Sequence, residues 1–290
     1  MLGIIGLGLV GSALCERFTR AGWSLCGFDI DGDALARARR LGVAACSSPA
    51  EVAARARRTV LSLPNSAVVD RVVLGEYGML AAMRAGDALI DTTTADPLAT
   101  VSLAQQLRAS EVHFVDATIL GSSQQVREGE TLVMAGGAVA DVRACDDVFN
   151  AFARSVFHMG ANGKGAEAKL VVNLVLGLNR LVLAEGLVLG ERAGINLNAL
   201  LDVLKAGAAY SRVMDHKGQK MVDGEFAPQA RLAQHAKDVE LIRSLAGRCA
   251  APLPLSEVHA QVLGRGLAEG LGDWDNAAVV EVLRRMASDT

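Results

Sequence analysis

The pattern Gly6-Leu7-Gly8-Leu9-Val10-Gly11 constrains the fold of this chain more than any other feature. It lies between an apolar run that predicts a strand over Leu2–Gly6 and a periodic stretch that predicts a helix over Val10–Ala21. In such a unit Gly6 permits the tight turn, Gly8 lets a pyrophosphate approach the backbone, and Gly11 packs the helix on the strand. The free N–H groups of the helix then face the phosphates. The alternative is a glycine turn with a purely structural role.

Asp29 stands where a dinucleotide-binding motif requires an acidic residue. It closes a predicted strand over Leu25–Asp29 and follows Gly11 by 18 positions, close to the usual spacing of about 20. A carboxylate there accepts the ribose hydroxyls of NAD and repels the extra phosphate of NADP. We therefore expect NAD as the cofactor. Asp31 lies nearby, but it is better placed as the N-cap of the following helix.

Short apolar runs alternate with helical stretches through the first half of the chain. Two helix starts are marked by an N-cap residue followed by proline, at Ser48-Pro49 and Asp96-Pro97. Further strands are predicted over Thr59–Leu63, Ala88–Asp91, Val112–Ala117, Thr131–Ala135 and Val156–Met159. This alternation predicts an α/β Rossmann domain with a doubly wound, mostly parallel sheet.

Strand signals end at the glycine-rich segment 160–163. Helices are predicted beyond it over Lys164–Ala193, Leu197–Ala206, Arg212–Val222, Ala230–Ala246, Leu255–Glu269 and Asn276–Ala287. We therefore expect a Rossmann domain over residues 1–161 and an all-helical domain over residues 162–290.

The apolar segment Leu170–Leu189 has the length of a membrane span. It also carries Asn173, Asn179, Arg180 and Glu185, each of which is costly in lipid. A helix buried on most sides of a soluble domain is the better interpretation.

Composition excludes several other functions. The net charge of −3 gives no basic face for nucleic acid or an anionic membrane. The five cysteines occur singly and the five histidines lack metal-ligand spacing, so neither a metal site nor a disulfide framework is expected. No basic segment precedes the first strand, so we expect no signal peptide and a cytoplasmic protein.

Lys169 and Asn173 are polar residues in an otherwise apolar helix, spaced so that they share one face. A lysine can exchange the proton of a substrate hydroxyl while an amide orients it. The alternative is a snorkelling lysine with a core asparagine bonded to backbone.

The segments Asp91–Thr94 and Gly121-Ser122-Ser123 follow strand ends, where ligands of open α/β sheets bind. These residue types are also common in plain turns.

Together these segments resemble the β-hydroxyacid dehydrogenases, the 3-hydroxyisobutyrate dehydrogenase family. The resemblance covers nearly the whole chain and is carried by Gly3–Gly8, Ser62–Asn65, Asp91–Pro97, Asp116-Ala117, Gly129, Gly136-Gly137, Gly163–Lys169, Asn173, Glu185, Phe226 and Lys237-Asp238.

The resemblance implies roles for individual residues. Lys169 would be the catalytic acid/base and Asn173 would help to bind the substrate. Leu63, Pro64 and Thr94 would line the cofactor together with the glycine loop, and Lys237 would lie near the nicotinamide end. The implied reaction transfers a hydride between nicotinamide and a small β-hydroxy acid, or a related alcohol or aldehyde. The active site would lie in the cleft between the domains of a homodimer or homotetramer.

The chain departs from the family where a substrate carboxylate should be anchored. The usual Asp-Ala-Pro-Val-Ser-Gly-Gly reads here Asp116-Ala117-Thr118-Ile119-Leu120-Gly121-Ser122. Leu120 replaces the serine, so residues Leu120–Ser123 are expected at a substrate site with altered preference.

Two other functions stay open. An imine reductase has a similar architecture but generally lacks a lysine at position 169, and a non-catalytic dinucleotide sensor would need the glycine loop and Asp29 only.

Overall fold

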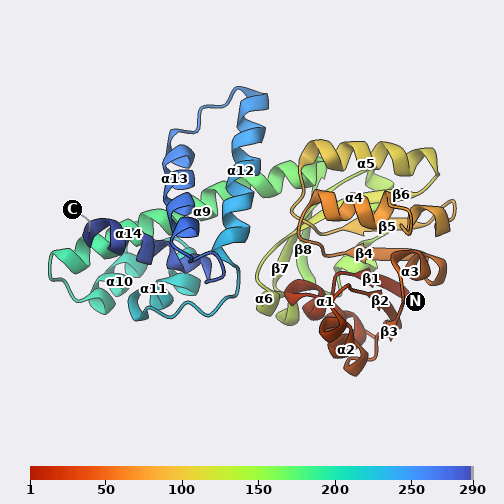
Figure 1. The fold of residues 1–290 in the computed structure, drawn as a ribbon, viewed down its shortest axis with the longest axis horizontal. Coiled ribbons are helices and arrows are strands. Elements are labelled where there is room, and N and C mark those ends of the chain that lie inside the picture. The colour runs from red at the N-terminus through yellow and green to blue at the C-terminus, as the bar shows by residue number, and fades with distance from the viewer. Residues whose placement is uncertain (289–290) are drawn as a thin grey trace. The chain divides into compact units, whose positions relative to one another are not determined.

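The computed structural model describes residues 1–288 and divides into two compact units (Figure 1). The first unit runs from Met1 to Lys169 and the second begins at Leu170. Helix α9 (Lys164–Arg192) continues through this boundary without a break.

The first unit is built on one eight-stranded sheet with the strand order β3-β2-β1-β4-β5-β6-β7-β8. Every neighbouring pair is parallel except β6 and β7, which are antiparallel. The strands are β1 (Leu2–Ile5), β2 (Leu25–Phe28), β3 (Ala44–Ala45), β4 (Arg58–Leu61), β5 (Ala88–Asp91), β6 (His113–Leu120), β7 (Thr131–Gly136) and β8 (Ala153–Gly160). The predicted doubly wound, mostly parallel sheet is confirmed. The two-residue β3 was not predicted because it is too short to show a pattern.

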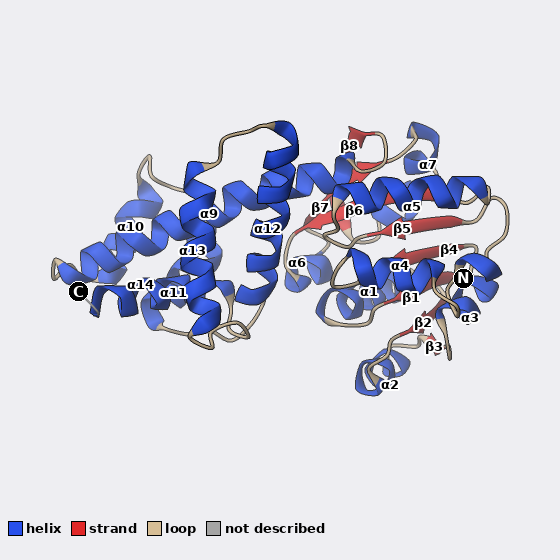
Figure 2. Ribbon diagram, turned by 45° about the horizontal axis from the view of Figure 1, so that its top comes forward, coloured by secondary structure: helices blue, strands red, loops and turns tan. Residues whose placement is uncertain are grey.

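Helices flank this sheet (Figure 2). They are α1 (Leu9–Arg20), α2 (Gly32–Arg40), α3 (Pro49–Arg55), α4 (Ser66–Leu74), the 3₁₀ turn η1 (Leu80–Ala82), α5 (Pro97–Ala109), α6 (Ser123–Glu128), α7 (Val139–Arg143) and α8 (Asp146–Phe149). The predicted N-caps are confirmed, since Asp31, Ser48 and Asp96 accept hydrogen bonds from the first turns of α2, α3 and α5.

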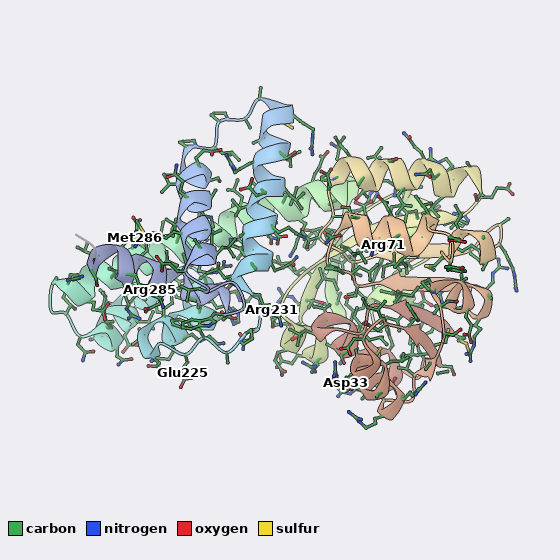
Figure 3. All side chains as sticks on the ribbon, in the orientation of Figure 1. Asp33, Arg71, Glu225, Arg231, Arg285 and Met286 are labelled. Carbon is green, nitrogen blue, oxygen red and sulfur yellow. The ribbon has the colours of Figure 1, made fainter. Side chains whose placement is uncertain are left out.

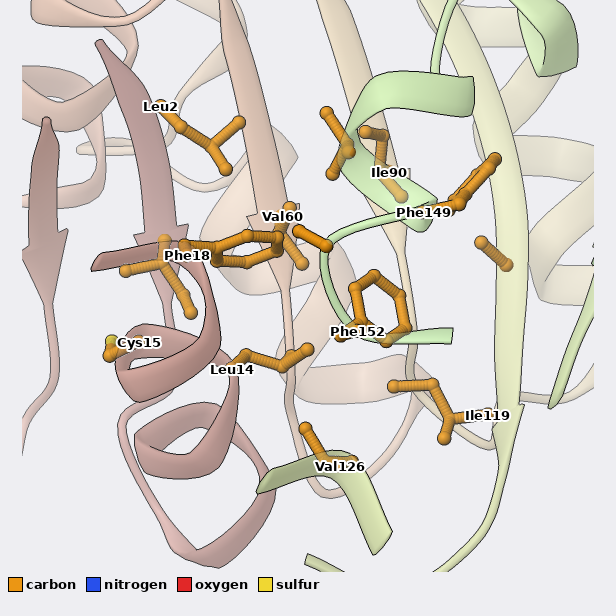
Figure 4. Packing of buried hydrophobic residues seen from close by; sticks show 14 of the residues in the cluster. Leu2, Leu14, Cys15, Phe18, Val60, Ile90, Ile119, Val126, Phe149 and Phe152 are labelled. Carbon is orange, nitrogen blue, oxygen red and sulfur yellow. The ribbon is translucent and has the colours of Figure 1, made fainter. Parts of the chain in front are cut away.

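The core of the first unit lies on both faces of the sheet, in two separate clusters of buried side chains. One cluster contains Phe18, Phe149 and Phe152 (Figure 4). Phe152 meets Phe18 and Phe149 edge to face, with ring centroids 5.8 and 6.3 Å apart, an arrangement that aromatic pairs favour. Charged side chains such as Asp33 and Arg71 lie at the surface of this unit (Figure 3).

The described part of the second unit is helical, as predicted. After α9 it contains α10 (Leu197–Ala206), the π-turn η2 (Met214–Gly218), α11 (Gln219–Asp223), α12 (Leu232–Cys249), α13 (Pro254–Ala268), the 3₁₀ turn η3 (Asn276–Ala278) and α14 (Val279–Ser288). Its buried Asp275 binds Lys217 Nζ at 2.7 Å and the backbone N–H groups of Gln229, Ala230 and Ala277, which joins three segments of the unit.

Helix α9 is less buried within this chain than expected. Only 39% of its most apolar stretch is buried, and Val171, Val175, Val182 and Leu189 are 52–73% exposed. By length and composition α9 would pass as a membrane-crossing helix, but a single such helix is weak evidence of one. The exposed residues are spaced by about one or two turns of helix, which places them along one side of α9.

Candidate active site

The glycine loop has the geometry that its sequence predicts. Gly6 has φ +87°, and a Cβ there would lie 2.1 Å from the carbonyl oxygen of Ser62. A Cβ on Gly11 would lie 1.9 Å from the carbonyl oxygen of Gly6. A Cβ on Gly8 would meet no atom within 4 Å. Gly6 and Gly11 are therefore required by the turn itself, whereas Gly8 leaves open space above the backbone.

The N-terminus of α1 lies beside that open space. Gly8 is its N-cap, no side chain caps the helix, and the first turn carries no acidic residue. The first N–H groups of a helix have no partner within it and favour an anion. The loop from Gly6 to Gly11 thus fits the pyrophosphate of a dinucleotide, with Leu7, Leu9 and Val10 between the glycines.

Asp29 is tied to this loop. Its Oδ2 accepts the N–H of Leu7 at 2.6 Å, and its Oδ1 accepts the N–H of Asp31 at 2.8 Å. A carboxylate has about four acceptor sites, so both oxygens can also accept ribose hydroxyls. Asp31 in turn accepts the N–H of Asp33 at 2.9 Å, which matches its predicted role as a helix cap.

Hydrogen bonds join the loops that follow β4 and β5. The Thr92 hydroxyl donates to the Leu61 carbonyl at 2.7 Å, and the Leu63 N–H donates to Thr93 Oγ1 at 3.2 Å. Because β1, β4, β5 and β6 are parallel neighbours, their carboxyl ends share one edge of the sheet. Leu63, Pro64 and Thr94 therefore lie at the same edge as the glycine loop, where nucleotides bind in such folds.

Strand β6 positions the start of α9. The Asp116 carboxylate accepts the N–H groups of Gly163 and Ala166, each at 3.0 Å. The Thr118 hydroxyl lies 3.0 Å from the Gly165 carbonyl. One turn later, Lys169 Nζ donates to the carbonyl of Ile119 at 2.7 Å. Half-buried Lys169 therefore points to the carboxyl end of β6 instead of extending into solvent as a snorkelling lysine would.

The segment Leu120–Ser123, expected at a substrate site, comprises the end of β6, a turn and the start of α6. Strand β6 extends to half-buried Leu120, and the chain turns at Gly121, which has φ +153°. Ser122 then caps α6 in a capping box, because its Oγ accepts the Gln125 N–H at 3.2 Å while the Gln125 side chain accepts the Ser122 N–H at 2.9 Å. The Ser122 oxygen is thus in use, although its proton can still be donated.

In the second unit, Asn173 is buried and donates from Nδ2 to Asp238 Oδ2 at 2.9 Å. Asp238 Oδ1 lies 3.2 Å from Lys237 Nζ. Two motifs that are far apart in the sequence, Asn173 on α9 and Lys237-Asp238 on α12, are thereby brought together. Asn173 follows Lys169 by one turn of α9, so the two residues share a helix face.

Further polar residues lie along α9 beyond Asn173. A Cβ on Gly177 would lie 2.5 Å from His235 Nε2, and the rings of His235 and His259 are 5.1 Å apart. Burial lowers the pKa of Arg180 to about 10, although Asp275 and Asp238 oppose the shift. Burial also lowers the pKa of His259 to about 4, and Arg180 adds to that shift. His259 is therefore neutral at pH 7.

Within residues 1–288 no three His, Cys, Asp or Glu side chains are placed to share a metal ion.

Family models match almost the whole chain. The NAD-binding domain of 6-phosphogluconate dehydrogenase matches residues 1–160, and the NAD-binding domain of NADP-dependent 3-hydroxyisobutyrate dehydrogenase matches residues 163–283. The chain belongs to the 3-hydroxyisobutyrate dehydrogenase family. It is an NAD(P)-dependent oxidoreductase, since relatives along its whole length are named as dehydrogenases and reductases.

Relatives and solved structures agree with this membership. The chain is 29% identical to 2-(hydroxymethyl)glutarate dehydrogenase of Eubacterium barkeri, over 98% of its own length and 95% of that protein. It is also 29% identical to L-threonate dehydrogenase of Escherichia coli, over 97% and 94%. The crystal structure of a 3-hydroxyisobutyrate dehydrogenase from Salmonella typhimurium superposes with a TM-score of 0.89 at 29% identity, covering 97% of this chain and 99% of that one.

Contacts that span many residues leave no local pattern in the sequence. Asp116 and Asp238 are visible there only as parts of motifs, and no pattern predicts a role for Thr118 or Arg180. A carboxylate inside the apolar strand around Asp116 was a usable signal, because a buried charge requires partners. The partners themselves lie 47 to 65 residues away, beyond the reach of local patterns.

Asp91 is a second buried carboxyl group at this edge and lies opposite Asp116 in the sheet. Burial raises the pKa of Asp91 to about 7; Thr93 opposes the shift with its hydrogen bonds, and Asp116 adds to it. Burial likewise raises the pKa of Asp116, against the N–H groups of Gly163 and Ala166. The fold therefore favours the neutral form of Asp91.

We expect Asp91→Asn to stabilise the first unit in a pH-dependent way. Because the pKa of Asp91 is raised, its stabilising contribution is complete below about pH 4 and is lost as the pH rises through about 7. The gain in unfolding free energy should thus grow over that window, to at most about 4 kcal/mol. Urea titrations from pH 4 to 8 measure it through Trp23, in a Trp274→Phe background that silences the other tryptophan.

The same titrations in a Trp23→Phe background follow the second unit through Trp274, and they should show no effect of Asp91→Asn. A gain that is constant from pH 4 to 8 would contradict the assignment, because it would not arise from ionisation.

Proposed function

We propose that this protein transfers a hydride between nicotinamide and a small β-hydroxy acid, or a related alcohol or aldehyde, with Lys169 as the general acid/base. The observation that carries the proposal is the contact of Lys169 Nζ with the Ile119 carbonyl at 2.7 Å, at the sheet edge that also holds the glycine loop. A bound NAD would accept or supply the hydride. The glycine loop, Asp29, Leu63, Pro64 and Thr94 would bind it, with Lys237 toward its nicotinamide end.

The proton is moved by the protein. The neutral amine of Lys169 takes the proton of the substrate hydroxyl as the alcohol becomes a carbonyl and thereby becomes an ammonium group, which returns that proton in the reverse direction. Asn173 has two N–H donors, one of which is used by Asp238. The other can donate to the substrate oxygen, and the bond to Asp238 keeps the amide from rotating. Neither an imine reductase nor a dinucleotide sensor requires this lysine, which favours the dehydrogenase.

We also propose that the chain forms a homodimer or homotetramer in the cytoplasm. The support is the exposed apolar side of α9, with Val171, Val175, Val182 and Leu189, since apolar surface of this kind favours association with another protein surface. Light scattering of the purified protein measures the subunit number, and a monomer at micromolar concentration would refute the proposal.

We expect Lys169→Ala to lower kcat by about 100-fold or more, the usual scale for loss of a general acid/base. NAD binding, measured by calorimetry, should be unchanged because the glycine loop is untouched. Lys164→Ala is the control, since Lys164 begins the same helix but its side chain is 55% exposed and pairs with Glu167. Turnover by Lys169→Ala at the wild-type rate would remove the lysine from the mechanism and favour the sensor.

We expect the wild type to prefer NAD over NADP by about 100-fold in kcat/KM, because Asp29 would repel the extra phosphate at a cost of about 3 kcal/mol. Asp29→Asn should reduce this preference at least about tenfold. Asp31→Ser is the matched control, because it removes a neighbouring carboxylate and leaves a residue that can cap α2. Equal or better turnover of NADP by the wild type would refute the proposal that Asp29 excludes NADP.

We propose that Leu120 moves substrate choice away from the smallest hydroxy acids, because an apolar side chain stands where a hydroxyl would bind the carboxylate. We expect Leu120→Ser to raise kcat/KM for 3-hydroxyisobutyrate and 3-hydroxypropionate by about 10- to 100-fold, the value of a hydrogen bond to a charged group. Leu120→Met, which keeps an apolar side chain of similar volume, is the control. If the wild type already turns over 3-hydroxyisobutyrate efficiently and the serine brings no gain, Leu120 has only a packing role.

A further inference from the structure

We propose that Thr118 is a positioning residue for Lys169, and that its hydroxyl group fixes the first turn of α9 on strand β6. This inference rests on the proposed role of Lys169 as the acid/base. It concerns a residue that differs from the proline usual at this position of the family motif. Proline has no hydroxyl group, so the contact described below is a property of this chain.

The Thr118 side chain is completely buried near the carboxyl end of β6. Its Oγ1 lies 3.0 Å from the carbonyl oxygen of Gly165 and 3.3 Å from that of Met134. A hydroxyl group has a single proton to donate, and the shorter contact is the one to α9. The Gly165 carbonyl therefore receives a side-chain donor from the sheet.

That carbonyl is also the partner of Lys169 within the helix. In an α-helix each N–H bonds to the carbonyl four residues earlier, and α9 includes both Gly165 and Lys169. The backbone N–H of Lys169 and the hydroxyl of Thr118 consequently share one acceptor. A change at Thr118 is transmitted to the backbone of Lys169 through a single oxygen atom.

The close approach of α9 to the sheet places this donor among carbonyl oxygens. A Cβ on Gly165 would lie 2.5 Å from the Asp116 carbonyl oxygen and 2.7 Å from that of Met134. These oxygens, like that of Gly165, are acceptors, so the crowded junction is rich in carbonyl groups. The Thr118 hydroxyl supplies a donor there, and without it the carbonyls of Gly165 and Met134 would face each other with one hydrogen bond fewer.

The next residue of β6 binds the other end of Lys169. The Ile119 carbonyl accepts the ammonium group at 2.7 Å. Successive residues of one strand thus bind the lysine through its backbone and through its side chain. A shift of the first turn of α9 away from β6 would lengthen the bond to Ile119 and move the ammonium group from its reacting position.

The test compares Thr118→Val, which keeps the shape and removes the hydroxyl, with Thr118→Ser, which keeps the hydroxyl. The matched control is Thr131→Val on β7, because Thr131 is equally buried and donates to the Phe152 carbonyl at 2.7 Å, away from α9. We expect Thr118→Val to lower kcat about tenfold, with the KM for NAD unchanged. Thr118→Ser should restore most of kcat, and Thr131→Val should lower the melting temperature without a loss of kcat.

A second measurement does not depend on turnover. Acetylation of Lys169 by acetic anhydride, followed by mass spectrometry, should become about 2- to 10-fold faster in Thr118→Val as the ammonium group is released from Ile119. Lys220 is the internal reference, because its ammonium group also donates to a backbone carbonyl, that of Ala227. If Thr118→Val does not fold, Thr118→Ala takes its place with the same expectations.

The two proposals can fail separately. Wild-type turnover by Lys169→Ala would refute the acid/base role, and the acetylation rates would still test whether Thr118 positions the lysine. Unchanged acetylation of Lys169 in Thr118→Val would overturn the positioning role, as would an equal loss of kcat in Thr118→Val and Thr131→Val.

Discussion

The carboxylate of Asp116 connects the sheet to the helix that carries Lys169, and the geometry of the candidate site depends on this connection. Its oxygens accept the N–H group of Gly163, directly before α9, and that of Ala166, in its first turn. N–H groups at a helix start have no acceptor within the helix. A carboxylate at this end also interacts favourably with the helix dipole. Asp116, Thr118 and Ile119 belong to one strand, β6. The position of that strand therefore sets both the backbone from Gly163 onward and the ammonium group of Lys169.

This connection requires glycine at two positions of the facing backbone. A Cβ on Gly136 would lie 2.6 Å from both oxygens of the Asp116 carboxylate and 2.8 Å from the backbone nitrogen of Gly165. A larger residue at position 136 would therefore displace the carboxylate from the helix start. The same atoms explain why both Gly136 and Gly165 lie in segments that resemble the family, since each permits the contact of β7 or α9 with Asp116.

Local patterns predicted much of the fold because they reflect interactions between close neighbours in the chain. The caps at Asp31, Ser48 and Asp96 bond to N–H groups two or three residues away, and Gly11 lies against the carbonyl of Gly6 in the same turn. The predictions failed where the deciding partner was distant or missing. The short β3 exists through its pairing with β2, and α9 is less buried than its composition suggested.

The sequence by itself determined the alternation of strands and helices, the glycine loop beside an acidic strand end, and the spacing of Lys169 and Asn173. Each of these follows from stereochemistry or periodicity within a few residues. Only the tertiary structure decided what these groups contact: Asp29 with Leu7, Lys169 with Ile119, and Asn173 with Asp238. Such contacts join residues 22 to 65 positions apart, so they depend on how the whole core packs, which no local pattern specifies.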